Sequence, residues 1–202
     1  MEKAANEMKI AIHPLEYYLI GINVFGFILY GVNMLLSRRS EGVKIDTVLF
    51  AVSLLGGTPG IVLCILLFDR KAVKENMMLR VFVACVLIMQ VLVYLFVRGW
   101  HGQGITLAFW TFFDRHKLLT AYLVAINFVT LTAFGIDKIR ALEQGHRIRI
   151  LTLLGLSFIG GSLGGWIGMH AFRHKTRQDY FAVGLPLIML TQAAAVFYLM
   201  NL

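Results

Sequence analysis

Six long apolar stretches, separated by short polar loops, dominate the hydrophobic pattern of the chain. Each has roughly the 17–25 residues that an α-helix needs to cross a ~30 Å hydrocarbon core. Apart from His170, none contains Asp, Glu, Lys, Arg or His. Strands would need an alternation of period two, which is absent, so we expect membrane-spanning helices. The six stretches are Tyr17–Leu36, Thr47–Phe68, Val81–Val97, Leu118–Ile136, Ile150–Phe172 and Tyr180–Leu202.

Composition supports this interpretation. The chain is 58% hydrophobic and only 15% charged, whereas a soluble domain has about 45–50% apolar and about 25% charged residues. The excess apolar surface has to be solvated by lipid, so the predicted fold class is an all-α integral membrane protein. Residues 1–14 lack the apolar core and cleavage site of a signal peptide, and the first span is expected to act as its own insertion signal.

The chain also shows internal similarity at a constant offset of 104 residues, which is the signature of duplication. We therefore expect two membrane repeats of three segments each, at 14–100 and 115–202, joined by an interfacial aromatic linker at 101–114. At this offset Leu15, Tyr18, Leu19, Ile22, Asn23, Gly31, Gly56, Gly57, Gly60, Phe68 and Lys71 recur as Leu119, Tyr122, Leu123, Ile126, Asn127, Gly135, Gly160, Gly161, Gly164, Phe172 and Lys175.

Three spans are an odd number, so six continuous spans would place the second repeat upside down. Lys and Arg then divide ten against nine between the two sides of the membrane, which fixes no orientation and is expected for two fused copies of opposite orientation. Duplicated halves of this kind often enclose a site at their interface, as in small transporters. An inverted repeat of six spans is the topology that we favour.

An alternative topology makes the glycine-rich second segment of each repeat a re-entrant hairpin, which gives parallel repeats. Fourteen basic residues would then face five, a clear bias. Gly56-Gly57-Thr58-Pro59-Gly60 suits such a turn, whereas the four-residue spacing of glycines in the second copy favours a flat stripe along a continuous helix. In both topologies we expect close helix packing at Gly56, Gly57, Gly60, Gly160, Gly161, Gly164, Gly165 and Gly168.

Polar residues inside the apolar segments are the candidates for chemistry. Asn23 and Asn127 match at the repeat offset, and Gln90 and Gln192 match at 102. Such amides either bond helices together or line a path for a substrate. Asp137 and Lys138 follow the fourth span, where an acid opposes the helix dipole, so we expect a cationic partner for Asp137. The six-span topology places the loop with Arg70 and Lys71 on the same side of the membrane as Asp137, and in the hairpin topology Arg173 and Lys175 would join them.

A second candidate site is the group of cations and a hydroxyl after the fifth apolar stretch. Charge-assisted hydrogen bonds from such a group could hold a phosphate or a lipid headgroup. His170 and His174 have the spacing of a helical metal pair, but nearby carboxylates are lacking, so we expect no metal site. No cofactor motif is present. The anion or headgroup candidates are Arg173, His174, Lys175 and Thr176, with Arg70 and Lys71 in the first copy.

The second half resembles the bacterial membrane family catalogued as domain of unknown function 1294, over about 85 residues. The first half resembles a degenerate copy that lacks the corresponding Asp, His and Thr. The family usually occurs as one unit of about three spans, and its name implies no activity. The resemblance rests on Asn127, Gly135-Ile136-Asp137-Lys138, Gly160-Gly161-Ser162-Leu163-Gly164, Gly168-Met169, Phe172-Arg173-His174-Lys175-Thr176, Pro186 and Gln192.

From architecture we expect a small ion or small-solute transporter or channel in the bacterial cytoplasmic membrane, with a site between the repeats. The alternatives are a lipid-headgroup-binding or lipid-modifying protein and a non-catalytic scaffold, so enzymatic activity stays undecided. The net charge of +8 comes from basic loops, which indicate contact with anionic headgroups. We expect the lipid bilayer as partner, possible self-association and no nucleic acid.

Overall fold

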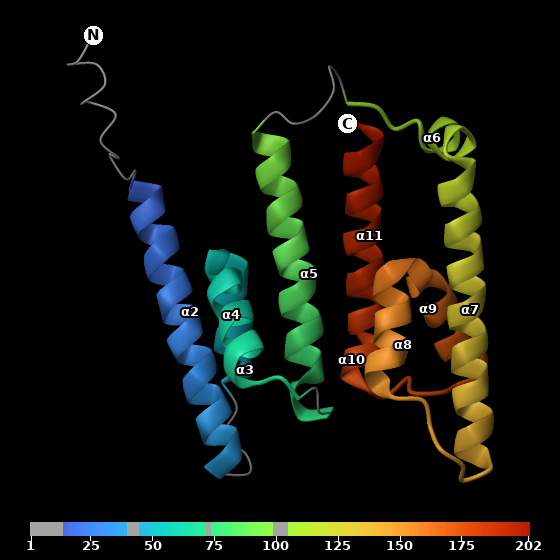
Figure 1. Cartoon of the computed structure of the whole chain (residues 1–202), viewed down its shortest axis with the longest axis horizontal. Coiled ribbons are helices and arrows are strands. Elements are labelled where there is room, and N and C mark those ends of the chain that lie inside the picture. Colours follow the sequence, from blue (N-terminus) through green and yellow to red (C-terminus); the bar gives the residue numbers. More distant parts are fainter. Residues whose placement is uncertain (1–13, 40–44, 72–73, 99–104) are drawn as a thin grey trace. The chain divides into compact units, whose positions relative to one another are not determined.

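A computed structural model describes residues 14–39, 45–71, 74–98 and 105–202, and in these ranges every regular element is helical (Figure 1). Six segments are long and apolar enough to cross a membrane, as the hydrophobic pattern predicts. Some residues used in the sequence predictions lie outside the described ranges: Lys3, Lys9, Lys44 and residues 99–104 around the start of the linker. The segments are Glu16–Leu36, Asp46–Phe68, Lys74–Val97, Lys117–Leu142, Ile150–Ala171 and Asp179–Met200.

The chain divides into two compact units, residues 1–71 and 72–202. The first unit contains the long helix α2 (Pro14–Arg39) followed by a broken segment. That segment consists of α3 (Asp46–Val52), a π-helical turn (Ser53–Gly57) and α4 (Thr58–Phe68). The break falls at Gly56, whose φ of 105° is in a region that residues with a Cβ rarely adopt. A turn is therefore present in the glycine-rich stretch where the alternative topology places one.

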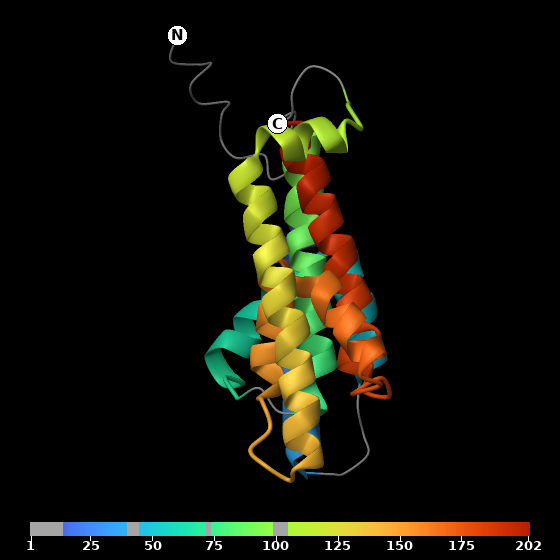
Figure 2. The same ribbon diagram turned by 90° about the vertical axis from the view of Figure 1, so that its right-hand side faces the viewer.

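The second unit begins with α5 (Lys74–Val97), and the short α6 (Phe109–Arg115) precedes the long α7 (Lys117–Leu142). Its broken segment comprises α8 (Ile150–Leu156), a π-helical turn (Ser157–Gly161) and α9 (Ser162–Ala171). The unit ends with α10 (Asp179–Ala182) and α11 (Gly184–Met200). Figure 2 shows α6 lying across the ends of α7 and α11. With seven residues, α6 is too short to span, as expected for an interfacial segment.

The expectation of a continuous helix through the glycine-rich segment of the second unit is wrong. Gly160 has φ of 126°, which ends one helix and turns the chain back. The peptide N–H of Ile148 bonds to Asp137 of α7 before the turn, and Lys175 bonds to the same carboxylate after it. Between them, the carbonyl of Gly160 bonds to Asn127. Both ends of the segment therefore lie at one level of α7 and its middle at another, so the segment is a hairpin.

The depth of this hairpin follows from helix geometry. Asn127 and Asp137 are ten residues apart in one helix, which corresponds to ~15 Å at 1.5 Å per residue. A hydrocarbon core is ~30 Å thick. The hairpin thus reaches along α7 for about half of that thickness and returns to the end where it began, as α8 and α9 do in Figure 1. The end near Asp137 is called the base of the hairpin, and the end near Gly160 its tip.

Opposite orientation of the two copies would require their third segments, α5 and α11, to run in opposite directions. Both lie in the second unit, and they begin at the same end. Gly184, the first residue of α11, packs against Val81 near the start of α5. The two helices then continue side by side in the same direction (Figures 1 and 2). The directions of these two helices do not fit the inverted topology that we favoured from sequence.

Three of the glycines face the long helices α7 and α2 with no room for a Cβ. A Cβ at Gly164 would overlap the carbonyl group of Asn127, and one at Gly161 would overlap the hydroxyl of Thr130. In the first unit a Cβ at Gly60 would overlap the carbonyl group of Asn23 in the same way. Because these glycines have no side chain, the backbone of each hairpin can approach the long helix beside it closely enough for the hydrogen bonds described below.

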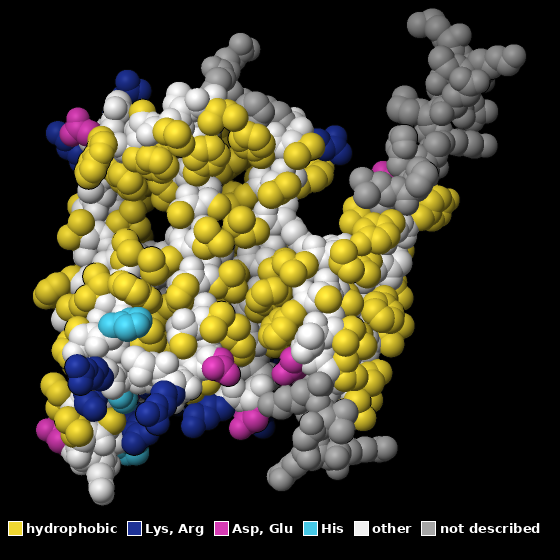
Figure 3. Space-filling view, turned by 180° about the vertical axis from the view of Figure 1, so that it is seen from behind, with side chains coloured by type: hydrophobic (Ala, Val, Ile, Leu, Met, Phe, Trp, Pro, Cys, Tyr) yellow, Lys and Arg dark blue, Asp and Glu magenta, His cyan; other side chains and the backbone are white. Residues whose placement is uncertain are grey.

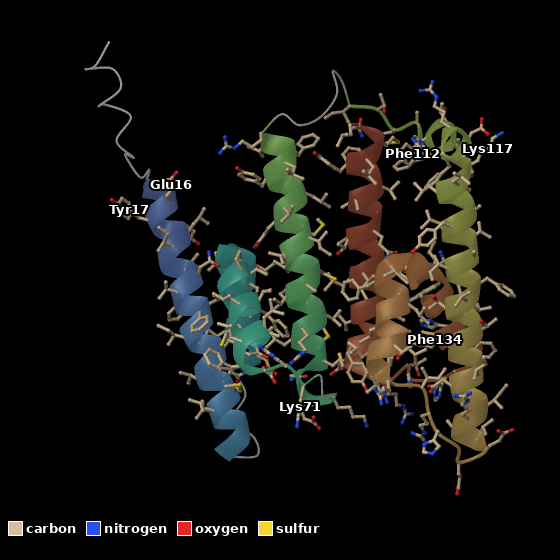
Figure 4. The ribbon with its side chains drawn as sticks, in the orientation of Figure 1. Glu16, Tyr17, Lys71, Phe112, Lys117 and Phe134 are labelled. Carbon is tan, nitrogen blue, oxygen red and sulfur yellow. The ribbon has the colours of Figure 1, made fainter. Side chains whose placement is uncertain are left out.

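The hydrophobic core of the second unit lies at the level of the hairpin, where α8 and α9 fill the space between α7 and the α5–α11 pair. Phe134 of α7 is fully buried and meets the ring of Phe181 edge-on, with centroids 5.4 Å apart. Figure 4 shows Phe134 on the part of α7 beside the hairpin, well away from Phe112 and Lys117 at the α6 end. On the α6 side of the tip, the hairpin does not extend between α7 and the α5–α11 pair.

Candidate functional site

The tip of the hairpin in the second unit is held by one asparagine of α7. Asn127 Nδ2 donates to the carbonyl oxygens of Leu123 (2.8 Å) and Gly160 (2.9 Å), and its Oδ1 accepts from the N–H of Gly164 at 2.7 Å. A backbone that breaks inside an apolar environment leaves carbonyl and N–H groups that must find partners. Asn127 supplies them on both sides of the break.

Gln192 of α11 holds the same tip from the opposite side. Its Nε2 donates to the carbonyl oxygens of Ser157 (2.6 Å) and Phe158 (3.0 Å), while Oε1 accepts from the hydroxyl of Ser162 at 2.5 Å. Sequence analysis identified Gln192 but missed Ser162, which is 2% exposed. The structure brings Asn127 and Gln192 together at one place, as candidates for a path would require. Their bonds also support the alternative interpretation, in which the amides join helices.

The tip in the first unit repeats this pattern. Asn23 Nδ2 donates to the carbonyl oxygens of Leu19 (2.7 Å) and Gly56 (3.1 Å), and its Oδ1 accepts from the N–H of Gly60 at 2.7 Å. Tyrosines five residues before each asparagine complete the match, because Tyr18 donates to the carbonyl of Leu55 and Tyr122 to that of Ile159. Each bond has its counterpart 104 residues further along the chain.

The base of the hairpin in the second unit is centred on a buried carboxylate. Asp137 is 0% exposed, and its Oδ2 lies 2.7 Å from Lys175 Nζ and 2.8 Å from His174 Nε2. Its Oδ1 accepts the N–H of Ile148 at 2.8 Å. Lys175 also lies over the ring of Phe181, 5.1 Å from the centroid. The cationic partner expected for Asp137 is thus present, and it is the lysine that the hairpin alternative named.

The corresponding position in the first unit uses an amide instead of a carboxylate. Asn33 Oδ1 accepts the N–H of Ile45 at 3.0 Å, which matches the bond from Ile148 to Asp137. Asn33 Nδ2 donates to Asp46 at 3.2 Å. The far end of the hairpin is tied separately, because Tyr30 donates to Asp69 at 2.6 Å. At this position of the first unit, an amide therefore takes the place of the buried carboxylate.

The remaining candidates lie around these two centres. Arg173 and Thr176 are exposed beside Lys175, and Lys138 is half-buried next to Asp137. Arg70 is exposed and donates to the carbonyl of Leu66, and Lys71 is exposed at the end of the first unit's hairpin. Gln90 is half-buried in α5.

The histidine pair considered for a metal is divided between two roles. His170 bonds to the carbonyl of Trp166, whereas His174 faces Asp137. Within the described ranges no group of three His, Cys, Asp or Glu side chains is placed to hold a metal ion.

Basic side chains gather at the hairpin base of the second unit, in the lower left of Figure 3. This unit has twelve Lys and Arg residues, of which nine lie near the base. The other three, Arg98, Arg115 and Lys117, lie at the α6 end. The nine are Lys74, Arg80, Lys138, Arg140, Arg147, Arg149, Arg173, Lys175 and Arg177.

These features define a class: an all-helical protein with membrane-length apolar segments and asparagine-held hairpins. The family model described as "Protein of unknown function (DUF1294)" matches residues 127–181, which begin at the tip asparagine and include the base. Uncharacterized protein YsdA of Bacillus subtilis (strain 168) is 39% identical over 83 residues, covering 40% of this chain and 93% of that protein. The chain therefore belongs to the DUF1294 family. No solved structure matches it.

Proposed function

We propose that this chain is a small-solute transporter or channel of the bacterial cytoplasmic membrane, in which the glycine-broken hairpins form the transport elements. One observation carries the proposal: a polar hairpin tip ends about halfway along α7 and borders a cavity. Irregular backbone at membrane depth is tolerated where protein or a cavity surrounds it. Broken helices that meet near the middle of the bilayer are where many transporters bind their substrates.

The topology that we propose has parallel repeats, each with two spans and one re-entrant hairpin. It is supported by the common direction of α5 and α11 and by the nine-to-three division of basic residues in the second unit. The positive-inside rule then places the hairpin bases in the cytoplasm. The Bacillus relative adds support for duplication, because 83 residues are 93% of it, so its whole length is about that of one repeat.

A second candidate function is the binding of anionic lipid headgroups at the base. It is favoured by the exposed Arg173 and Thr176, which lie next to the buried ion pair. Because Asp137 already neutralises Lys175, the charges available to a headgroup are those of the surrounding arginines. Such binding would also anchor the base in the cytoplasmic leaflet, so it is compatible with transport.

Flux measurements on proteoliposomes test the transport proposal. Stopped-flow light scattering would follow the entry of glycerol and urea, and ion-selective dyes would follow K⁺ and Cl⁻. We expect faster entry of an uncharged solute than in protein-free liposomes. Ala193→Phe, at a residue that lines the cavity, should abolish this increase, whereas Leu190→Phe on the 61%-exposed face of the same helix should not.

Two results would count against transport. Rates equal to those of protein-free liposomes for all four solutes would favour the headgroup function, which native mass spectrometry can test through retention of phosphatidylglycerol by the protein and its loss in Arg173→Gln. Equal inhibition by both phenylalanine variants would show that the cavity plays no special part.

A further inference from the structure

The cavity beside the hairpin tip is a consequence of the hairpin's short reach. At the base, α8 and α9 separate α7 from α11. Beyond the tip, α7 and α11 continue toward α6 with neither α8 nor α9 between them. The resulting cavity has a volume of about 330 Å³. Phe109 and Phe113 from the α6 region border it at the outer end, and Gly160 and Ser162 border it at the tip. It is therefore formed within the second unit alone.

The walls of this cavity are apolar. None of the described residues that line it is Asp, Glu, Lys, Arg or His. A charged molecule inside would lose its hydration without gaining an opposite charge, which costs several kcal/mol. Ions are consequently poor occupants. The walls consist of Phe109, Phe113, Leu123, Leu163, Met189 and Val196.

The three polar side chains at the tip, those of Asn127, Gln192 and Ser162, can accept hydrogen bonds but have no proton left to donate. Both Nδ2 protons of Asn127 and both Nε2 protons of Gln192 are used for backbone carbonyl groups. The single hydroxyl proton of Ser162 goes to Gln192 Oε1. Each of the three side-chain oxygens still has a lone pair, because an amide oxygen or a hydroxyl has two. An occupant that donates a hydrogen bond would fit this lining, whereas one that only accepts would not.

We propose that the cavity binds an uncharged, mainly apolar small molecule that donates a hydrogen bond, such as an aromatic or aliphatic alcohol. The inference builds on the proposed function by naming its substrate class. Ligand pockets start at about 300 Å³, and an apolar cavity of about 150 Å³ holds benzene. A volume of 330 Å³ therefore accommodates a substituted ring. A lipid acyl chain would fill the walls but donate no hydrogen bond to the remaining lone pairs of these three oxygens.

Four fluorinated probes of nearly equal size separate these possibilities. ¹⁹F NMR line broadening would be measured for 4-fluorobenzyl alcohol, 4-fluorotoluene, 4-fluorobenzoate and 4-fluorobenzylammonium with the full chain in nanodiscs, against empty nanodiscs. We expect saturable binding of the alcohol. The toluene, which lacks the donor, should bind about tenfold more weakly, and the two ions should bind no better than they do to empty nanodiscs.

Variants locate the binding site. Ala193→Phe, which fills the cavity, should remove saturable binding of the alcohol, and Leu190→Phe should leave it unchanged. Equal binding of the alcohol and the toluene would overturn the role of the acceptor oxygens. Preferred binding of the ammonium would point to a cation site and overturn the proposal. Absence of any saturable probe binding, with a phospholipid retained by the parent and lost in Ala193→Phe, would assign the cavity to an acyl chain.

This experiment is independent of transport. Binding of the alcohol without flux of any solute would retain the site and remove the transporter proposal. Flux that Ala193→Phe blocks, without binding of the alcohol, would retain the transporter and remove the substrate class.

Discussion

The two hairpins of this protein are held alike at their tips and differently at their bases. Asn23 and Asn127 make the same three hydrogen bonds, five residues after tyrosines that also match. At the base, an amide in the first unit corresponds to the buried carboxylate Asp137 in the second, which is bonded to His174 and Lys175. The tips therefore serve the fold in both units, and the base distinguishes one unit from the other.

The difference has a physical meaning. A broken helix needs partners for its freed backbone groups wherever it occurs, so the tip cannot vary without loss of the hairpin. A carboxylate at the position of Asp137 is not required for the shape, because the first unit has the amide of Asn33 there, with hydrogen bonds from Ile45 and to Asp46. A buried ion pair costs desolvation and is weak evidence for stability. The buried carboxylate Asp137, where the first unit has Asn33, therefore marks the base of the second unit as the specialised one.

The largest effect is expected at the tip glycines. Gly164→Leu and Gly60→Leu each place a side chain where the carbonyl group of the facing asparagine lies. Overpacking costs about 1–3 kcal/mol or more, so both variants should lose most of their folded yield. Gly155→Ala and Gly21→Ala, whose added Cβ atoms meet nothing within 4 Å, are the controls. Detergent-solubilised yield and melting temperature measure the outcome, and a Gly164→Leu variant as stable as the parent would contradict the close packing.

Asp137→Asn should have the next largest effect. It leaves Lys175, 8% exposed, without its negative partner, and breaking one side of a buried pair costs about 3–5 kcal/mol. A second change, Lys175→Met, removes the uncompensated charge and should restore part of the lost stability. The measurement is thermal unfolding of the two single variants and the double variant. If the double variant is no more stable than Asp137→Asn, the ion pair is not the reason for the loss.

Asn127→Ala and Asn23→Ala test the equality of the tips. Each removes three hydrogen bonds and leaves a buried backbone N–H and carbonyl group unpaired, at about 1–3 kcal/mol for each unsatisfied group. We expect the two melting temperatures to fall by similar amounts. A large loss at one asparagine and none at the other would mean that only one hairpin depends on its tip, and the structural equivalence of the two units would fail.

Asn33→Ala should have the smallest effect of the series. It removes hydrogen bonds to Ile45 and Asp46 but leaves no buried charge. A loss of about 1 kcal/mol is expected, well below that of Asp137→Asn. Comparison of the two melting temperatures checks this difference. Equal losses would remove the distinction between the bases.

Much of this architecture could be predicted from sequence, because apolar length and the matched positions are local properties. The hairpin in the second unit could not. Gly161, Gly164, Gly165 and Gly168 do form a packed stripe along α9 and its start, as the spacing indicates. Gly160 belongs to the same spacing but has a positive φ. Spacing reports which glycines share a face and says nothing about the backbone conformation of any one of them.

Several residues of the site could be named from the sequence, but the contacts between them could not. A polar amide in an apolar segment was recognisable, but its partners are backbone groups, which have no sequence signature. Ile148 was missed for the same reason, because it takes part through its N–H. Ser162 takes part through its hydroxyl, but its contact with Gln192 depends on the turn at Gly160. The lysine that pairs with Asp137 was named only under the alternative topology, because contact between residues 38 positions apart depends on whether the chain between them turns back.

The central claim is that the segment between Asp137 and Lys175 enters the membrane and returns to the same side. Single cysteines at Glu143, Thr176 and Asp114, in a variant with Cys64 and Cys85 replaced, can be labelled with a membrane-impermeant maleimide in intact cells and in inverted vesicles. We predict that positions 143 and 176 react only in inverted vesicles and that position 114 reacts in intact cells. Reaction of positions 143 and 176 from opposite sides would show a continuous span and contradict the account.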